Sequence, residues 1–331
     1  MLIFISIIVF WTVQVSAVLA VLVPFSWAMA GLWAVSHFLR AIGLTLSFHR
    51  YFAHRTFQMN RAARFVWALI GTAAMQKGPL WWAGHHVNHH KFADREGDPH
   101  SPAITGFYHA HIGWFLNDAR HDRLEATNPV LRDFSSAPEI VWLDRYHFVP
   151  PLALAVGLFL SGGLQWLVWG FCVPTVTLAH STFAINTVNH MFGSRRFDTI
   201  DDSRNNVLTA FFAAGEGWHN NHHRYQRAAR NGFFWWEFDP TWYVIKLMAA
   251  VGLAWDVQAV PARIYAEARA RQAERRMMGR GVPLVPVDVV DEVTAAAAGI
   301  ELDDVANGGG MAARGRGAVG LLEENRRPAS A

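Results

Sequence analysis

Apolar residues run uninterrupted by charge along two long stretches of the chain. Arg40 is the first charged residue, and the second stretch lies between Arg145 and Arg195. A membrane-spanning helix needs about 20 predominantly apolar residues, so each stretch is long enough for two crossings. This pattern predicts two helical hairpins in a membrane.

Residues that favour turns divide both stretches near their middle. Pro24 and Ser26 interrupt the first stretch, and Ser161, Gly162 and Gly163 interrupt the second. Proline ends helices, and glycine adopts turn conformations that other residues avoid. We therefore expect four membrane helices, near residues 2–22, 27–48, 147–161 and 165–187.

Lysine and arginine are distributed unevenly around these hairpins. The turns carry none, whereas segments 49–145 and 195–280 carry nearly all of them. Cytoplasmic loops of membrane proteins are enriched in Lys and Arg, so both segments and both termini are expected in the cytoplasm. The predicted fold is all-α: a multi-pass membrane protein with four transmembrane helices and a helical cytoplasmic cap.

A cleaved signal peptide is the alternative interpretation of the first apolar stretch. Residues 16–20 read Ser-Ala-Val-Leu-Ala and offer a small-residue cleavage site. The chain start lacks the basic segment that such peptides carry, so we favour a membrane helix.

The composition agrees with a membrane protein. Apolar residues make up 52% and charged residues 17%, whereas soluble proteins contain about 25% charged residues. The 15 tryptophans fit as well, since tryptophan favours the membrane–water interface. The net charge of +3 gives no support to nucleic-acid binding, and a single cysteine, Cys172, excludes a disulfide framework.

The composition changes near residue 269. Aromatic residues stop after Tyr265, and the remaining chain is rich in Ala, Gly and Val. We expect one main domain over residues 1–260. The extension over 261–331 is expected to be largely disordered from about residue 277, with room for one short helix over 287–302.

Histidines form three clusters in the two cytoplasmic segments, one with the spacing H-x4-H and two with the spacing H-x-x-H-H. Helix positions i, i+3 and i+4 lie on one face, so the three imidazoles of an H-x-x-H-H triplet are expected to point at a common place. The members are His49 and His54; His86, His89 and His90; and His219, His222 and His223.

The pair in the first cluster poses a geometric problem. His49 and His54 are five residues apart, which is about 140° around an α-helix. We expect them to share a face only if the helix breaks between them. Otherwise they serve different metals or flank a helix end.

Metal binding explains these clusters better than packing, which gives no reason to repeat H-x-x-H-H. Imidazole alone does not select the metal, because zinc, copper, iron and nickel all accept it. Eight nitrogens exceed the four ligands of a structural zinc site, so two ions with open positions fit better. The sequence therefore predicts a carboxylate-poor, histidine-rich di-metal site at the cytoplasmic ends of the membrane helices.

These clusters resemble the three histidine boxes of the membrane-bound fatty acid desaturase family, most closely its acyl-CoA Δ9 (stearoyl-CoA) branch. The resemblance covers roughly residues 20–260. In that family, boxes of the form H-x4-H, H-x2-H-H and H-x2-H-H bind two irons. The resemblance implies this role for all eight histidines named above.

The resemblance also implies a ninth ligand. The branch carries a pattern N-x-x-x-H a few residues after the fourth membrane helix, which here runs from Asn186 to His190. His190 therefore resembles a metal ligand. Asn186 resembles the residue that reaches a metal through a water molecule.

The sequences flanking the boxes agree with the family, with one departure. Lys-Phe-Ala-Asp follows His90 and Gly-Glu-Gly-Trp precedes His219, as in the family. The chain has His85 where the branch familiar from animals has Asp. His85 and His180 are candidates for side chains that orient the metal-bound histidines.

The resemblance implies an O2-dependent acyl-CoA desaturase that inserts a cis double bond, at Δ9, into a saturated fatty acyl-CoA during unsaturated fatty acid biosynthesis. Two iron ions (Fe2+) would be the cofactors and O2 the co-substrate. We identify no dinucleotide-binding fingerprint in a strand–helix context and no cysteine-based iron–sulfur pattern. A separate electron donor of cytochrome b5, ferredoxin or rubredoxin type, with its reductase, is therefore expected. We expect the chain itself to lie in a bacterial cytoplasmic membrane.

Three other functions stay open at this point. The same site could hydroxylate an alkane, sterol or lipid, because the two reactions diverge only after the first hydrogen is taken. The acyl chain could be linked to a lipid or a carrier protein instead of CoA. A metal transporter is the third, but it would need more polar residues in the membrane helices than His37, Arg40 and His180.

Overall fold

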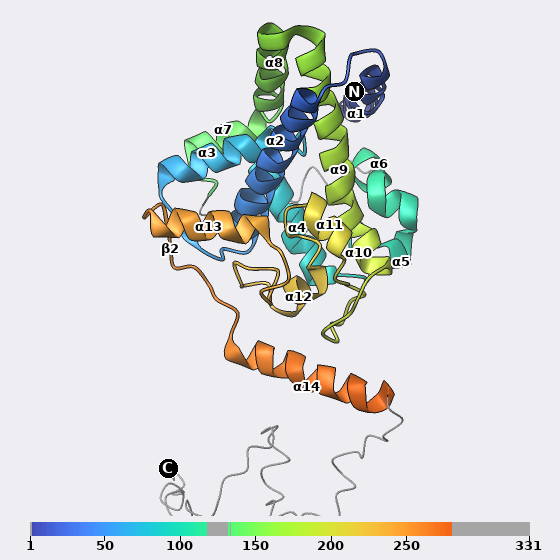
Figure 1. Cartoon of the computed structure of the whole chain (residues 1–331), viewed down its shortest axis with the longest axis vertical. Helices are drawn as coiled ribbons and strands as arrows, with labels where there is room; N and C mark the ends of the chain where they lie inside the picture. Colours follow the sequence, from blue (N-terminus) through green and yellow to red (C-terminus); the bar gives the residue numbers. More distant parts are fainter. Residues whose placement is uncertain (1, 118–131, 133, 280–331) are drawn as a thin grey trace, which may run out of the picture. The chain divides into compact units, whose positions relative to one another are not determined.

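The computed structural model describes residues 2–117, 132 and 134–279. Their regular structure is almost entirely helical, which confirms the predicted helical class (Figure 1). Within these residues the exception is a short antiparallel ribbon, in which β1 (Gln58–Met59) pairs with β2 (Ala254–Trp255). Residues Met1–Arg271 form one compact unit, and the second unit begins at Gln272.

The first apolar stretch forms two helical segments separated by a turn. Ser26 begins the second segment, because its hydroxyl accepts a hydrogen bond from the backbone N–H of Met29. From Trp27 the chain stays helical well past residue 48, where the sequence suggested an end. The elements are α1 (Leu2–Ser16), η1 (Ala17–Val21), α2 (Trp27–Gly43) and the π-helix η2 (Leu44–Ala53).

Short helices fill the segment between the two apolar stretches. Asn60 caps α3 through a 2.8 Å hydrogen bond from the N–H of Ala63, and Pro79 starts α4 at a position where a helix tolerates proline. The elements are α3 (Arg61–Thr72), α4 (Pro79–Phe92), α5 (Pro102–Thr105), the π-helix η3 (His109–Gly113), α6 (Trp114–Asn117) and α7 (Pro138–Arg145).

The second apolar stretch folds back on itself at the turn expected from its glycines. Gly162 and Gly163 have non-helical dihedral angles, and Gly163 adopts φ 62° and ψ −153°, a region open essentially to glycine alone. Figure 1 shows the hairpin at the top of α8. The elements are α8 (Val149–Leu167), the π-helix η7 (Val168–Cys172), α9 (Val173–Asn186) and α10 (Val188–Met191).

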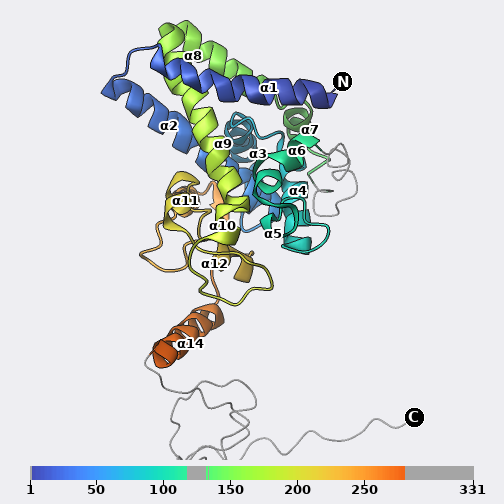
Figure 2. The ribbon, with the colours of Figure 1, turned by 90° about the vertical axis from the view of Figure 1, so that its right-hand side faces the viewer.

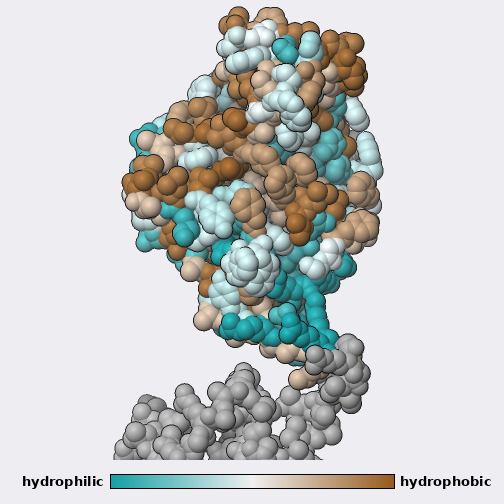
Figure 3. Space-filling model, viewed as in Figure 1, coloured by the Kyte–Doolittle hydropathy of each residue, from teal (hydrophilic) through white to brown (hydrophobic). Residues whose placement is uncertain are grey.

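Two helices in the described part of the chain are long and apolar enough to cross a membrane, Trp27–Ala53 and Val149–Met191. The apolar helix Ile7–Val21 is shorter. Large apolar side chains of α8 are exposed, among them Leu152, Phe159 and Leu160, and apolar residues lie among paler ones on the surface around this helix (Figure 3). Such a surface suits lipid, so membrane association is supported. Four crossings and their orientation remain predictions.

The remaining helices follow the second apolar stretch. Asp239 caps α13 by accepting a hydrogen bond from the N–H of Trp242, and Ile264 and Ala268 of α14 pack in a small cluster with Phe197. The tail expected to be disordered lies outside the described residues from residue 280 onward. The elements are α11 (Val207–Phe212), α12 (His219–Arg224), α13 (Pro240–Ala250) and α14 (Ala262–Gly279).

The main core holds the two segments that carry the first two histidine clusters. Phe48 and Phe52 of η2 are fully buried and belong to one cluster with Leu80 of α4 and Ile245 of α13. Figure 2 shows α10 and α12 at the end of α9 away from α8. The core therefore fixes the helices that meet below the apolar hairpins.

The turn in the second hairpin can be tested by adding one methyl group. Gly163→Ala should lower the free energy of unfolding by about 1–3 kcal/mol, because a Cβ is disfavoured at this backbone conformation. A Cβ at Gly163 meets no atom within 4 Å, so the effect would come from the backbone alone. Thermal unfolding of the detergent-solubilised chain measures it.

Gly157→Ala is the matched control. Gly157 lies in the same helix, has no positive φ and also offers open space for a Cβ. Equal melting temperatures for the two variants would show that the turn at Gly163 imposes no conformational demand.

Candidate metal centre

The nine histidines expected to bind metal gather into two groups, which we name site A and site B. Within each site, one ring nitrogen of every histidine lies within 4.8 Å of the others. The role of each histidine as a ligand remains a prediction, whereas their convergence is a feature of the fold. Site A contains His49, His54, His86, His90 and His222; site B contains His89, His190, His219 and His223.

Each H-x-x-H-H triplet divides between the two sites instead of pointing at one. In α4, His86 and His90 belong to site A and His89 to site B. In α12 the first and last histidines belong to site B and the middle one to site A. Helix positions i and i+4 lie about 40° apart, whereas i+3 lies about 100° from i+4. The expected convergence of each triplet on a common place is therefore wrong.

His49 and His54 meet because the helix that carries them is a π-helix. The backbone N–H of His54 donates to the carbonyl of His49 at 3.1 Å, the i to i+5 pattern of a π-helix. Five residues then complete just over one turn, and the two ring centroids lie 4.7 Å apart. The expectation that only a helix break would bring them together is corrected: the helix widens and stays continuous.

The nitrogens of site A are too crowded for hydrogen bonding alone. The Nε2 atoms of the five rings contact one another in sequence, so the middle ones each have two nitrogen neighbours. An imidazole nitrogen donates or accepts but never does both, so one proton or one lone pair would have to serve two contacts. A cation between the rings accepts all the lone pairs at once. The Nε2–Nε2 distances are 3.0 Å for His49–His222, 2.9 Å for His222–His90, 2.9 Å for His90–His86 and 2.9 Å for His86–His54.

Carboxylates hold three of the four rings of site B from behind. The Nδ1 atoms lie 3.0 Å from Asp98 in His89, 2.7 Å from Asp94 in His190 and 2.7 Å from Asp201 in His223. A carboxylate at Nδ1 takes the proton-bearing nitrogen and leaves the Nε2 lone pair free for a metal.

The Nε2 atoms on the opposite side of these rings are placed to bind a cation. In His89 and His223, Nε2 is buried and has no hydrogen-bond partner among residues that the structure describes. Nε2 of His190 lies 3.1 Å from Nε2 of His219. Buried nitrogens are normally satisfied, so unpaired lone pairs in a common location fit a metal ligand set.

A buried charge cluster orients His49 in site A. Nδ1 of His49 lies 2.6 Å from Glu216, and the same carboxylate accepts hydrogen bonds from Arg50 and Asn231. Arg50 is only 1% exposed and also bonds both oxygens of Asp239. Removing one member would leave a buried charge without its partner, which is strongly destabilising.

Burial and neighbouring charges set the protonation of the centre. Burial first, and then repulsion among the rings, lowers the pKa of His86, His90 and His222 well below 6.5, so these rings are neutral and able to bind metal at pH 7. Burial raises the pKa of Asp94, but the hydrogen bond and charge of His190 outweigh it and lower that pKa to about 2. The carboxylate is therefore ionised.

Sequence reasoning missed the roles of the four carboxylates that contact the rings, although Asp94 and Glu216 stand in the flanking motifs that resemble the family. Asp94, Asp98 and Asp201 have no fixed spacing from the histidines they hold. Glu216 stands three residues before His219 in a Glu-x-x-His spacing, a pattern of carboxylate metal sites. Here it contacts His49 instead, so the spacing would have marked the residue without giving its role.

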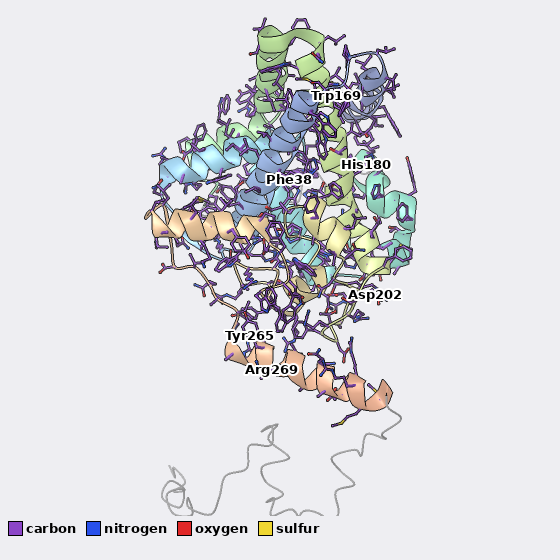
Figure 4. All side chains as sticks on the ribbon, in the orientation of Figure 1. Phe38, Trp169, His180, Asp202, Tyr265 and Arg269 are labelled. Atoms are coloured by element: carbon purple, nitrogen blue, oxygen red, sulfur yellow. The ribbon has the colours of Figure 1, made fainter. Side chains whose placement is uncertain are left out.

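The two histidines suggested as orienting groups lie elsewhere. Nδ1 of His85 contacts the carbonyl of Trp81 at 2.8 Å, within α4. His180 sits partway up α9 (Figure 4) and contacts His111 at 3.0 Å and Gln14 at 3.1 Å. Neither contact involves a histidine of site A or B. Asn186, at the end of α9, precedes His190 by one turn, and its role through water stays a prediction.

Neighbouring histidines of α4 allow a matched test of the site. His86→Gln should lower the divalent metal bound per chain, because it removes one of the five nitrogens of site A. His85→Gln should leave the metal content unchanged, since His85 belongs to neither site. Elemental analysis of the purified chains by mass spectrometry measures both. Equal metal loss in the two variants would contradict the assignment of site A.

Comparison with known proteins agrees with this centre. The family model for fatty acid desaturases matches residues 24–259. The chain is 40% identical to a palmitoyl-monogalactosyldiacylglycerol delta-7 desaturase of Arabidopsis thaliana over 66% of this chain and 58% of the relative, so it spans less than two thirds of that protein.

Two further relatives are covered more completely. An icosanoyl-CoA 5-desaturase of Limnanthes douglasii is 38% identical over 75% of this chain and 70% of the relative. An sn-2 palmitoyl-lipid 9-desaturase of Nostoc is 38% identical over 73% of this chain and 87% of the relative. With the histidine sites described above, these matches place the chain in the fatty acid desaturase family.

Proposed function

We propose that this chain is an O2-dependent desaturase that inserts a cis double bond, at Δ9, into a saturated fatty acyl-CoA. Two iron ions would occupy sites A and B. The observation that carries the proposal is the convergence of nine imidazoles into two adjoining groups at the ends of apolar helices. Membership of the desaturase family supports the reaction class.

The spacing of the nitrogens supports iron over structural zinc. For metal–nitrogen bonds of about 2.1 Å, a tetrahedral ion needs its ligands about 3.4 Å apart, whereas nitrogens at right angles lie about 3.0 Å apart. The consecutive Nε2 atoms of site A are separated by 2.9–3.0 Å. This spacing argues against a tetrahedral ion, and the five histidines of site A would together hold one iron ion.

The metal pair, when bound, supplies the oxidising power that removes hydrogen from an unactivated CH2 group, which side chains lack. The chain's own residues orient and shield the ligands. Asp94, Asp98 and Asp201 hold the rings of site B, and Trp82 stacks on His86 with centroids 5.0 Å apart. The apolar helices α2 and α9 would hold the acyl chain beside the sites and exclude water.

The reaction also needs a source of electrons. The donor would be a separate protein of cytochrome b5, ferredoxin or rubredoxin type, docking on the cytoplasmic face with the help of complementary charge.

Four membrane helices would place the sites and both termini in the cytoplasm of a bacterial cell. Residues 1–260 would form the catalytic domain and 261–331 an extension, and Asn186 would reach site B through water.

A lipid-linked acyl chain is the second candidate substrate. The Nostoc relative is named for a palmitoyl-lipid and the Arabidopsis relative for palmitoyl-monogalactosyldiacylglycerol, whereas the Limnanthes relative is named for icosanoyl-CoA. These names favour no single carrier. The carrier is therefore the first property to measure.

Membranes containing the chain and a donor system should convert added saturated acyl-CoA to a monounsaturated product, detected by mass spectrometry of the fatty acids. His89→Ala should abolish the product, since it removes a nitrogen of site B, whereas Asp202→Asn should retain it. A hydroxy acid, or an unchanged profile from a metal-loaded chain, would contradict desaturation.

The same assay identifies the carrier when sampled early. With labelled stearoyl-CoA, the double bond should appear first in the CoA pool. Its first appearance in membrane lipid would replace the acyl-CoA proposal by the lipid-linked one.

A further inference from the structure

We propose that the two sites bind divalent metal unequally: site B fills first and holds its ion more tightly, and site A fills last. The inference rests on the proposed function in so far as both sites hold metal. It arises from a difference in what stands behind the rings. Carboxylates contact three of four rings in site B but only one of five in site A among the described residues.

The carboxylates of site B are buried and keep their charge for the rings. The side chains of Asp98, Asp94 and Asp201 are 0%, 6% and 12% exposed. Besides the histidines, their described partners are neutral: the Ser101 hydroxyl and backbone N–H groups, including that of Asp202. Three negative charges would therefore lie behind the rings that hold one ion, and charge in a low-dielectric site is weakly screened.

The single carboxylate of site A is largely neutralised. Glu216 accepts two hydrogen bonds from Arg50, a cation that is 1% exposed, in addition to holding His49. Two other rings of the site have no carboxylate at Nδ1 among the described residues. Nδ1 of His90 and Nδ1 of His222 are buried and find no hydrogen-bond partner in the described part of the chain.

Site A has five histidine nitrogens and site B has four, but the additional nitrogen does not give site A the higher metal affinity. An imidazole is neutral, so adding one shares the charge of the ion without balancing it. Burying a charge is unfavourable unless an opposite charge accompanies it. Carboxylates behind metal-bound histidines each change metal affinity by about 10–100-fold. Two additional carboxylates in site B should therefore outweigh one neutral ligand in site A.

The loss of side-chain freedom on metal binding also favours site B over site A. In site B, three rings are fixed at Nδ1 before any metal arrives, so little freedom is lost on binding. In site A only His49 is held by a carboxylate, and Nδ1 of His90 and Nδ1 of His222 have no hydrogen-bond partner among the described residues, so binding an ion there would cost more ordering. Asp94, Asp98 and Asp201 are thus positioning residues of site B, and Glu216 is the positioning residue of site A.

Titration of the full, metal-free chain in detergent with Co2+, followed by its absorption spectrum, tests the inference without any activity measurement. We expect two steps of one ion each, with the first at least about tenfold tighter. Asp201→Asn should weaken the first step by about 10–100-fold, and Glu216→Gln should weaken the second step alone.

Asp202→Asn is the matched control for Asp201→Asn. Its side chain is 51% exposed and pairs with Arg195, so both steps should remain as in the unchanged chain. If Asp201→Asn fails to fold, as judged by its melting curve, Asp94→Asn and Asp98→Asn test the same site.

Two results would overturn the inference: a single step with equal affinities in the unchanged chain, or a Glu216→Gln variant that weakens the first step. Failure of the inference is distinguishable from failure of the proposed function. Two unequal Co2+ steps in a chain that forms no unsaturated product would leave the inference intact and contradict only desaturation.

Discussion

The convergence of nine imidazoles on two adjoining points constrains the structure around them. In site A the Nε2 atoms of His222 and His90 lie 2.9 Å apart, and each has another such neighbour. Hydrogen bonding cannot satisfy a series of this kind, because one nitrogen cannot donate and accept together. A cation between these rings would accept their lone pairs, and the surrounding helices hold the rings in the positions that such a cation needs.

The structure meets this demand with two kinds of support. Packing holds the backbone, since fully buried Phe48 and Phe52 fix the π-helix that carries His49. Charge holds the rings, since a carboxylate at Nδ1 sets both the tautomer and the orientation of an imidazole. Glu216 connects the charges to the packed π-helix, because it contacts the ring of His49 and accepts hydrogen bonds from Arg50, a buried residue of the same helix. The chemistry of a desaturase thus rests on a polar layer directly below an apolar one.

Much of this could be predicted from the sequence. Charge-free stretches located the apolar hairpins, and glycine at residues 162 and 163 located the turn, because hydropathy and backbone freedom are local properties. Repeated H-x-x-H-H spacing identified six of the clustered histidines, since packing gives no reason for it, and the H-x4-H cluster added His49 and His54. His190 came from the family resemblance alone, because a single histidine carries no spacing of its own.

Only the tertiary structure decided how the histidines are shared. Helix spacing places His89 on a different face from His86 and His90, but its meeting with His190 depends on where α4 meets α10 and α12. The π-helix that unites His49 with His54 depends on packing around η2. Two of the carboxylates come from distant segments: Asp94 is 96 residues from His190, and Glu216 is 167 residues from His49 in the sequence. The sequence by itself determined which residue types are clustered along the chain, because spacing and side-chain chemistry are local properties. Long-range contacts determined which of these residues meet, because the packing of distant helices is not encoded in local spacing.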